Sequence, residues 1–368
     1  MSETNKKLKI LINAVPLQNP EFGGIPRYTK IIVEALRREP DIEIALAHCL
    51  FIKAKFKIFK IFTKPLNLFF TLAWEQIYLP VRLLLGQYDL YFSPSNTGVP
   101  CFTNKKVVST IHDIIPFLLP SKESSGTNII NLQFIKWRMR VAILRSTKII
   151  TVSNYSKQTI VDYFKVSPDK IINAYSGADN FNDCHKDSRQ VFQQLQKKFN
   201  LKPGYIMGIG GGHSRKNNKT LIEAAANIKD RQLVITGVPD SSIKDSNCIF
   251  TGYIDDDELK ALYENAGVFV YLSIFEGFGV PPLEAMICGC PAIISNRTSL
   301  PEVSGDAAMS FDPYDVPAIT QGIIKMLTDE ECRSEYIRKG RIQAAKFTRA
   351  GTTDAIIKIL RDCISCNN

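Results

Sequence analysis

Residues 271–291 read YLSIFEGFGVPPLEAMICGCP, and this stretch determines how the second half of the chain folds. An apolar run ends at Leu272, a glycine-containing loop follows, and Pro281 and Pro282 stand where a helix would begin. Proline is favoured in the first helical turn, because the N–H group that it lacks would have no helical acceptor there. The stretch therefore predicts a strand, a loop and a helix, which together form the repeating unit of parallel α/β sheets.

The first turn of this expected helix is a candidate anion site. The backbone N–H groups of Phe278, Gly279 and Val280 have no helical acceptor, and such groups bind phosphates together with the positive end of the helix dipole. Glu276 and Glu284 flank them, and carboxylates there can accept hydrogen bonds from ligand hydroxyls. The pattern favours a phosphorylated ligand rich in hydroxyl groups. The spacing alone leaves open a solvated loop position for Glu276 and a helix-dipole role for Glu284.

Alternating strands and helices extend over the rest of the chain. Apolar runs predict strands at 9–15, 90–93, 106–111 and 148–152 in the first half, and at 205–209, 232–236, 248–251, 268–272 and 291–295 in the second. Amphipathic patterns predict helices at 28–37, 191–199, 219–228 and 258–266, and one that begins after Ser153 as its cap. The acidic run 255–258 is interpreted as a helix cap and first turn rather than a metal site. These elements predict two doubly wound α/β units, joined by the polar stretch 176–202.

Length and composition agree with two globular domains. The chain has 368 residues, of which 45% are hydrophobic and 22% charged, which excludes disordered, collagen-like and multi-span membrane proteins. The longest apolar run, Pro65–Trp74, is shorter than the ~20 residues of a membrane span, and no signal peptide is recognisable, so a cytoplasmic location is expected. Among the nine cysteines only Cys363 and Cys366 are spaced as a ligand pair, so we expect reduced thiols and no zinc site.

Positive charge is concentrated in the first half of the chain. Residues 1–180 contain 24 Lys/Arg and 13 Asp/Glu, whereas residues 181–368 contain 22 and 23. Residues 51–64 read FIKAKFKIFKIFTK, and on a helix four of their lysines would fall within about 60° of one another, opposite most of the Phe and Ile side chains. This pattern is typical of a helix in an anionic membrane interface. A core-packed helix with a solvated lysine face is the alternative.

Residues 276–308 resemble the donor-binding segment of glycosyltransferase family 4, whose members are retaining enzymes with the GT-B fold. The Glu-x7-Glu pair of that family falls on Glu276 and Glu284. Seven further blocks occur in the family's order: GGIPRY (23–28), WEQIYLP (74–80), HDIIP (112–116), VSNYSK (152–157), SGAD (176–179), SRKN (214–217) and TGYIDDDELKALY (251–263).

The resemblance implies an α/β GT-B fold, in which two Rossmann-like doubly wound domains face each other across a cleft. A C-terminal helix at 352–363 would cross back to the N-terminal domain. The acceptor-binding N-terminal domain would comprise residues 1–178 plus 350–368, and the nucleotide-sugar-binding C-terminal domain residues 179–349.

The resemblance also implies roles for single residues. Glu284 would bind the ribose hydroxyls of the nucleotide, and Glu276 the hydroxyls of the donor sugar. Lys216 matches the family's diphosphate lysine, and Arg215 is the candidate substitute for a family arginine a few residues upstream, where this chain has glycine. His112 matches a histidine near the reacting sugar. The other donor-binding candidates are backbone groups and loop glycines: Gly23, Gly24, Gly211, Gly212, Tyr253, Ile254, Phe278, Gly279 and Val280.

The implied reaction is retaining transfer of a hexose from a nucleotide-sugar, with GDP-mannose favoured, to a hydroxyl of a glycan or lipid-linked acceptor in polysaccharide or lipopolysaccharide synthesis. No metal or other cofactor is expected, because Lys216, Arg215 and N–H donors can neutralise a diphosphate. The other expected partner is an anionic membrane surface at residues 51–64, on the inner face of the cell membrane; no motif indicates nucleic acid. A UDP-sugar transferase of the same fold and a non-catalytic, basic membrane-binding protein with a decayed donor site are the alternatives.

Overall fold

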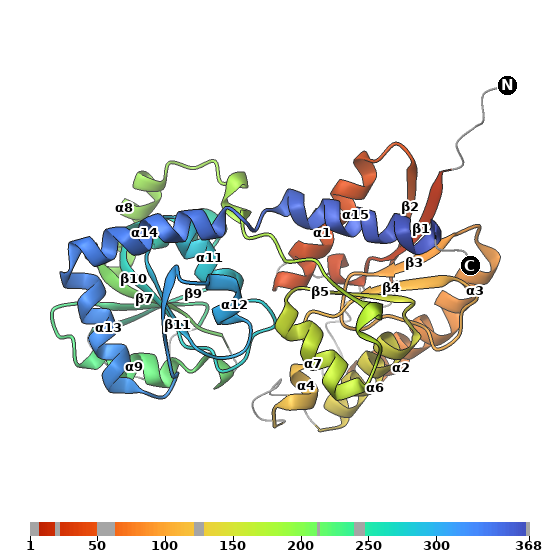
Figure 1. The fold of residues 1–368 in the computed structure, drawn as a ribbon, viewed down its shortest axis with the longest axis horizontal. Helices are drawn as coiled ribbons and strands as arrows, with labels where there is room; N and C mark the ends of the chain where they lie inside the picture. Colours follow the sequence, from red (N-terminus) through yellow and green to blue (C-terminus); the bar gives the residue numbers. More distant parts are fainter. Residues whose placement is uncertain are drawn as a thin grey trace.

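The computed structural model describes residues 7–18, 23–49, 63–120, 129–211, 214–238 and 247–365, and it contains two six-stranded parallel sheets (Figure 1). The first sheet has the order β2-β1-β3-β4-β5-β6. Its strands are β1 (Leu8–Asn13), β2 (Ile42–Ala47), β3 (Leu90–Ser93), β4 (Lys106–Thr110), β5 (Lys148–Thr151) and β6 (Ile171–Asn173).

The second sheet has the order β12-β11-β10-β7-β8-β9, which from β9 onward is the 3-2-1-4-5-6 order of dinucleotide-binding folds. Its strands are β7 (Tyr205–Ile209), β8 (Leu233–Thr236), β9 (Cys248–Gly252), β10 (Ala266–Tyr271), β11 (Ala292–Ser295) and β12 (Ala308–Phe311). In such sheets the strand order reverses at one point, here between β7 and β10, and ligands bind beyond the carboxyl ends of the strands at that point.

Helices cover both faces of each sheet. Around the first sheet lie α1 (Gly24–Arg38), α2 (Thr63–Ala73), a π-helical turn (Trp74–Tyr78), α3 (Leu79–Leu85), α4 (Ile115–Leu118), α6 (Ile129–Arg145) and α7 (Asn154–Phe164). Around the second lie α8 (Ser188–Phe199), α9 (Asn218–Ala226), α10 (Asp256–Asn265), α11 (Val280–Ile287), α12 (Leu300–Ser304), α13 (Val316–Thr328) and α14 (Glu330–Ala344). Four 3₁₀ turns (Val15–Gln18, Pro168–Lys170, Asn180–Asp183 and Ser214–Lys216) complete the description together with α15 (Arg349–Ser365).

The expected helix caps are present. Ser153 accepts a hydrogen bond from the backbone N–H of Ser156 and begins α7. Asp255 and Glu258 form a reciprocal capping box, so the acidic run 255–258 is the cap and first turn of α10 as predicted. The helix begins at Asp256, two residues earlier than the apolar pattern indicated.

Three strands were not predicted from the sequence, namely β2, β6 and β12. All three lie at an edge of their sheet. An edge strand is bonded on one side only and can keep side chains in solvent, so it needs no continuous apolar run. Strand β2 accordingly contains the exposed residue Glu43, and β12 the exposed residue Ser310.

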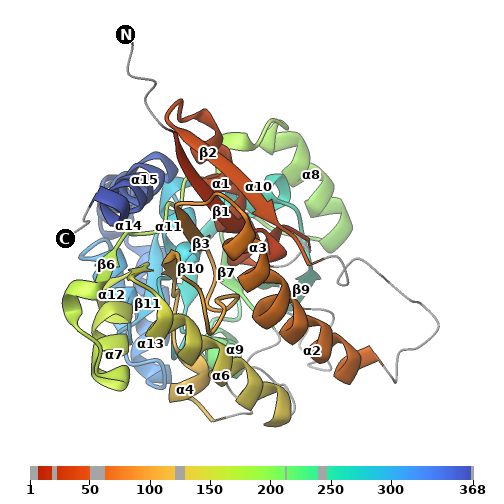
Figure 2. The ribbon, with the colours of Figure 1, turned by 90° about the vertical axis from the view of Figure 1, so that its right-hand side faces the viewer.

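Helix α15 crosses from the second half of the molecule back to the first (Figures 1 and 2). Its buried residues pack with α1 and the first sheet: Ile356, Ile357, Ile359, Leu360 and Cys363. The predicted crossover helix is therefore confirmed, while the exact domain boundary at residue 178 stays a prediction.

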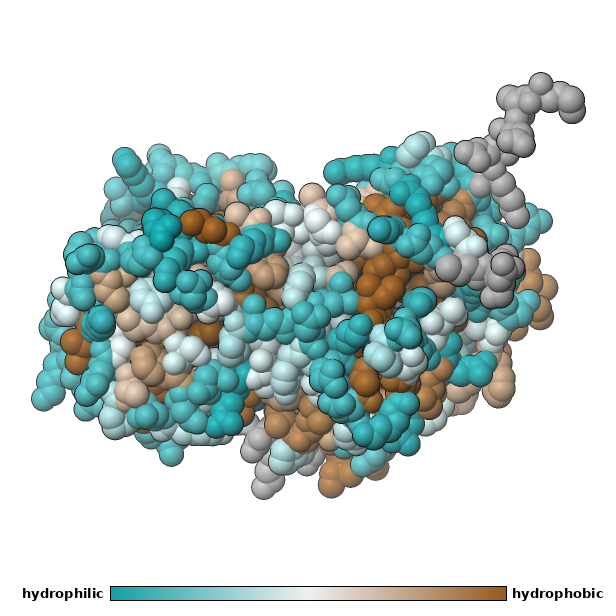
Figure 3. Space-filling view, viewed as in Figure 1, coloured by the Kyte–Doolittle hydropathy of each residue, from teal (hydrophilic) through white to brown (hydrophobic). Residues whose placement is uncertain are grey.

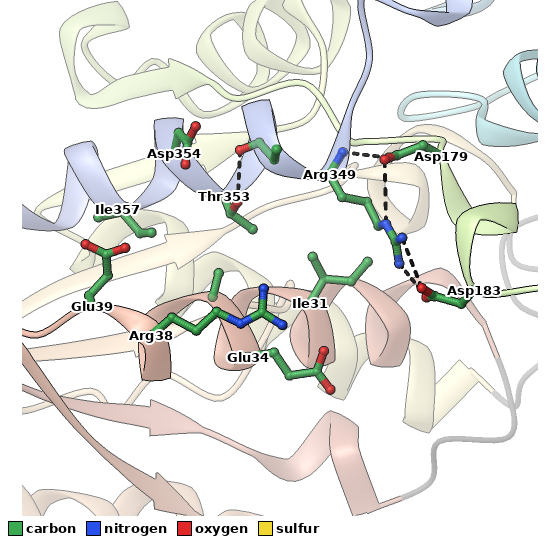
Figure 4. Close-up of a pocket in the computed structure, with 12 residues that line it drawn as sticks. Ile31, Glu34, Arg38, Glu39, Asp179, Asp183, Arg349, Thr353, Asp354 and Ile357 are labelled. Atoms are coloured by element: carbon green, nitrogen blue, oxygen red, sulfur yellow. Dashed lines mark hydrogen bonds and ion pairs between the residues drawn. The ribbon is translucent and has the colours of Figure 1, made fainter.

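The start of α15 is tied to the connection between the two sheets. The Arg349 guanidinium bonds Asp183 at 2.6 Å, and the backbone N–H of Arg349 donates to Asp179, as Figure 4 shows. This contact lowers the pKa of Asp183 below its ordinary value. Between α1 and α15 runs a groove of about 520 Å³ with a largely acidic lining, which includes Glu34 and Asp354.

The segments α2, the π-helical turn and α3 form one continuous helix over residues 63–85. By length and composition its stretch Leu68–Leu85 is apolar enough to cross a membrane, and 22% of that stretch is buried. The apolar segment is thus longer than the run Pro65–Trp74 counted in the sequence, because few polar residues interrupt it. Residues 51–62 lie outside the described residues, so the membrane hypothesis for 51–64 stays a prediction.

We expect Leu360→Ala to destabilise the protein by about 2–5 kcal/mol, because it opens a cavity between α15 and the first sheet. Lys358→Ala, at an exposed position of the same helix, is the matched control and should cost little. Urea unfolding followed by fluorescence measures both. Equal stabilities for the two variants would show that α15 is not part of the first core.

Candidate active site

A cavity of about 560 Å³ opens between the two halves, at the carboxyl ends of strands from both sheets. From the first half it is lined by the loop after β1, with Gly23 and Gly24, and by His112 after β4. From the second half it is lined by the turn Ser214–Lys216 and by the loop that joins β10 to α11. The sites predicted in separate parts of the sequence thus share one cavity.

Glu276 is the centre of a buried polar cluster. One carboxylate oxygen, Oε1, accepts hydrogen bonds from Arg215 Nη1 and Lys216 Nζ, both at 2.8 Å, and from the hydroxyls of Tyr271 at 2.8 Å and Ser273 at 2.7 Å. The Lys216 ammonium also contacts the Tyr271 hydroxyl. Two cations and two hydroxyls therefore hold a single oxygen in place.

The charges of this cluster shift its pKa values. Burial alone would raise the pKa of Glu276, but the neighbouring Lys216 and Arg215 outweigh it and lower that pKa to about 2. Burial lowers the pKa of Lys216, although Glu276 opposes this. Around neutral pH the cluster therefore contains an ionised Glu276 carboxylate that bonds the Arg215 and Lys216 side chains, and Asp113 lies in the same cavity.

Glu284 lies on α11, within the same cavity. Its Oε1 accepts a hydrogen bond from Asn180 at 2.7 Å, and the Arg27 guanidinium lies 3.8 Å away. Burial raises the pKa of Glu284, and the Asn180 bond and the Arg27 charge counteract this. Arg27 also bonds both carboxylate oxygens of Asp256 at 2.6 Å, so it links the first half to α10.

Helix α11 begins beside this pair as the proline signal predicted. Gly279 is its N-cap with φ = 104°, a left-handed conformation that glycine adopts without strain. The Ser299 hydroxyl donates to the carbonyl oxygens of Glu276 and Phe278 and so holds the loop. Phe278, Gly279 and Val280 all line the cavity.

The glycine loop of the first half leaves open space. Gly23 has φ = 102° and caps α1, and an added Cβ at Gly23 or Gly24 would meet no atom of the described residues within 4 Å. A ligand can therefore approach the backbone closely at this point.

His112 is half-buried and follows the carboxyl end of β4. Its Nε2 lies 3.3 Å from the carbonyl oxygen of Pro94, its backbone N–H donates to Asn96, and the ring of Tyr28 packs edge-on against it. Burial lowers the pKa of His112 to about 4, so the imidazole is neutral near pH 7. Asp113 forms a turn by accepting from the N–H of Ile115, and it does not bond His112.

The two halves touch directly beside the site. The carbonyl oxygen of Gly277 accepts from Ser153 at 2.6 Å and from Ser156 at 3.0 Å, and a Cβ on Gly277 would collide with the backbone of His112. Glu302 on α12 accepts from the backbone N–H groups of Asn154 and Tyr155, which form the first turn of α7.

Three described candidates, Gly211, Tyr253 and Ile254, are not among the residues that line this cavity. Gly211 lies beside the Lys216 side chain, and Gly212 is not among the described residues. Tyr253 is exposed and Ile254 packs on the core of the second half, so their predicted contact with the nucleobase stays a prediction. Within the described part of the chain, no three His, Cys, Asp or Glu side chains gather as metal ligands.

Sequence reasoning missed several partners in the site. Tyr271 and Ser273 lie within five residues of Glu276, and their hydroxyls in the quoted stretch were an available signal. The partners Asn180, Asp256 and Glu302 contact residues more than 100 positions away, so no local pattern could have indicated them.

The family model described as "Glycosyl transferases group 1" matches residues 191–343. The serotype-specific mannosyltransferase WbdA of Escherichia coli is 31% identical over 271 residues, which is 69% of this chain and 33% of WbdA. O-antigen chain mannosyltransferase B of Escherichia coli is 30% identical over 269 residues, or 69% of each chain. The chain thus spans about a third of WbdA but two thirds of the second relative.

A solved structure has the same fold. HepE of Anabaena in complex with UDP-glucose superposes with a TM-score of 0.71 at 14% identity, and the match covers 96% of this chain and 100% of HepE. Two doubly wound parallel sheets, a cleft between them and a returning C-terminal helix constitute the expected GT-B fold. Together with the family match and the mannosyltransferase relatives, these features identify the chain as a member of the glycosyl transferases group 1 family.

Proposed function

We propose that the chain is a retaining hexosyltransferase, which moves mannose from GDP-mannose to a hydroxyl of a glycan or lipid-linked acceptor in surface polysaccharide or lipopolysaccharide synthesis. The observation that supports this most is the cavity itself, in which Arg215, Lys216 and the start of α11 place positive charge between two glutamates. The names of the relatives, both mannosyltransferases, support mannose as the sugar.

In this proposal each half of the site binds one part of the donor. Glu284 accepts hydrogen bonds from the ribose hydroxyls. Glu276 accepts one from a sugar hydroxyl through Oε2, because its other oxygen, Oε1, already accepts four hydrogen bonds. The N–H groups at the start of α11 and the Lys216 and Arg215 cations bind the diphosphate. Gly23 and Gly24 leave room for the diphosphate on the side of the cavity that the first half forms.

The proposed transfer needs no side chain as a nucleophile. The acceptor oxygen bonds to the anomeric carbon on the face that the diphosphate leaves, the bond from that carbon to the diphosphate oxygen breaks, and the acceptor proton passes to a diphosphate oxygen. Lys216 and Arg215 stabilise the charge that grows on the diphosphate, and the closed cavity positions both reactants. His112 is neutral and lines the cavity, where it can hydrogen-bond the donor sugar. We propose that no metal ion is required.

A UDP-sugar is the alternative donor, since HepE is bound to UDP-glucose. A non-catalytic, membrane-binding protein is the alternative from another class. The intact Glu276 cluster disfavours it, because burying a carboxylate with two cations costs desolvation free energy. A protein that binds no ligand there has no functional reason to retain such a cluster. We further propose a peripheral position on the inner face of the cell membrane, with residues 51–64 as one contact.

The donor assignment predicts different defects for the two glutamates. We expect Glu284→Gln to weaken GDP binding by about 10–100-fold, because a hydrogen bond to a charged group contributes about 1.5–3 kcal/mol. Glu276→Gln should retain GDP but lose the additional affinity for GDP-mannose and slow the hydrolysis of GDP-mannose. Calorimetry with GDP, UDP, GDP-mannose and UDP-glucose measures affinity, and NMR of the released sugar reports whether its anomeric configuration is retained.

Glu223→Gln is the matched control for this experiment, because Glu223 is exposed on α9 of the same half. It should bind as the wild type does. Unchanged GDP binding and unchanged GDP-mannose hydrolysis in both Glu284→Gln and Glu276→Gln would contradict the donor site. Preferential binding of UDP would indicate a UDP-sugar as the donor without changing the enzyme class.

The ionised state of Glu276 predicts a dependence of stability on pH. The pKa of Glu276 is about 2 in the folded protein against 4.5 ordinarily, so its stabilising contribution is complete above pH 5 and is lost as the pH falls toward 2. The difference in unfolding free energy between the wild type and Glu276→Gln should therefore shrink by about 2 kcal/mol between pH 7 and pH 3. Urea unfolding at each pH tests this, and a constant difference would contradict an ionised Glu276.

A further inference from the structure

The continuous helix 63–85 has an apolar face on the outside of the molecule. Trp74, Leu79 and Leu83 are buried against the first sheet. On the opposite side, a stripe at helical spacing is exposed: Ile77 (65% exposed), Tyr78, Val81, Leu84 (68%) and Leu85 (78%). A soluble helix normally carries polar residues on that side.

Helix α6 extends the same outer surface. It packs on the same face of the first sheet as α3, through Met139 and Ile143, and Figure 2 shows it beside α2 and α3. Its outward residues include Ile130, Trp137 and Leu144, which are seven positions apart and lie on one side of the helix. The exposed ring of Phe102 lies under the Arg145 guanidinium next to them.

The exposed charges on the described helices that carry these apolar residues are positive. Helices 63–85 and 129–145 contain six Lys/Arg, and Glu75 is their one acidic residue. Glu75 is fully buried and bonds Arg138 at 2.6 Å, so it contributes no negative charge to the surface. Figure 3 shows brown and tan atoms toward the lower right, where α2 and α3 lie.

We propose that the outer face of α2, α3 and α6 (Ile77, Tyr78, Val81, Leu84, Leu85, Phe102, Ile130, Trp137, Leu144) is a docking surface for an anionic lipid bilayer. The apolar side chains enter the acyl boundary, Trp137 and Tyr78 lie at the level of the headgroups, and Arg140 and Arg145 bind lipid phosphates. Among the described residues of these helices the exposed charges are cationic, which is complementary to anionic lipid, whereas a second copy of this chain would bring like charge against them.

The helix lies along the bilayer rather than across it. The carboxylate of Glu75 bonds Arg138 of α6 and the backbone N–H of Gly98, which tie the middle of the helix to the first sheet. Spanning would break these bonds and carry an ionisable group into hydrocarbon. The same helix that satisfies the length criterion for a span is therefore an interfacial one.

The docking surface adjoins the acceptor side of the cleft. Helix α4 begins three residues after His112, and its residue Phe117 packs under the Lys136 ammonium of α6. A sugar attached to a membrane lipid could thus reach the cavity while its lipid stays in the bilayer. This last step rests on the proposed function, whereas docking itself does not.

The test uses the full chain and sedimentation with vesicles of phosphatidylglycerol or phosphatidylcholine. We expect binding to phosphatidylglycerol that weakens with salt. The double variant Leu84→Asn/Leu85→Asn should bind at least tenfold more weakly, and Arg140→Gln/Arg145→Gln should show a weaker salt dependence than the wild type. Ile342→Asn, at an exposed apolar position on α14, is the matched control and should bind as the wild type does. GDP binding by calorimetry should be unchanged in all variants.

Several outcomes would overturn the docking surface. One is that the protein does not bind phosphatidylglycerol vesicles, and another is that Leu84→Asn/Leu85→Asn and Ile342→Asn bind them equally well. A third is that light scattering shows a dimer, which Leu84→Asn/Leu85→Asn converts to a monomer while vesicle binding stays unchanged. Loss of binding only when the lysines of 51–64 are replaced would assign docking to that segment instead. Resistance to carbonate extraction would overturn the parallel orientation. Because GDP binding is measured separately, failure of docking leaves the transferase proposal intact, and the reverse also holds.

Discussion

A carboxylate buried between two cations is the interaction on which the geometry of the cleft depends. Glu276 can remain ionised in the interior only because Lys216 and Arg215 bind the same oxygen. The turn that carries the two cations must therefore lie against the loop after β10, and the bond from the N–H of Ile274 to the carbonyl oxygen of Arg215 fixes that contact. These two side chains and the start of α11 line the same cavity, and the helix dipole favours an anion there.

The same loop carries the contacts that close the two halves on each other. The carbonyl oxygen of Gly277 meets the serines at the start of α7, and Glu302 meets the N–H groups of that helix. Arg27 and Asp256 form the corresponding contact on the other side of the cavity. These are mainly hydrogen bonds and ion pairs, which can break without opening the core of either sheet. The chain crosses between the halves twice, near 176–183 and at the start of α15, and the Arg349 pair with Asp183 joins both crossings. This arrangement suits a cleft that opens to exchange a nucleotide.

Local patterns in the sequence were sufficient for the central strands, the helix caps and the position of Glu276 and Glu284 beside a helix start. Central strands are buried on both faces and leave continuous apolar runs, whereas the edge strands β2, β6 and β12 do not. Arg215 was inferred only as a substitute, and the structure places it on Glu276. The bonds of Asn180 to Glu284 and of Arg27 to Asp256 join residues that only the folded topology brings together. The continuous helix 63–85 was missed because Glu75 and Gln76 interrupt its apolar run. Glu75 can be buried there because it bonds Arg138 of α6 and the backbone N–H of Gly98, which are distant in the sequence.

The uneven charge of the chain has a physical reason in this architecture. The excess of Lys/Arg belongs to the first half, and six of these cations lie on helices 63–85 and 129–145, which expose apolar residues on their outer face. The second half is nearly neutral overall, and two of its cations, Lys216 and Arg215, line the cavity. A soluble nucleotide-sugar needs a local positive site in a cavity, because only there is the charge protected from screening by salt. A bilayer is extended and anionic, so it is attracted by many exposed charges that each contribute on the order of 1 kcal/mol. The two halves meet at loops and helix ends, so one chain can satisfy both requirements. Each sheet presents its outer face independently, while the reacting groups share one cleft.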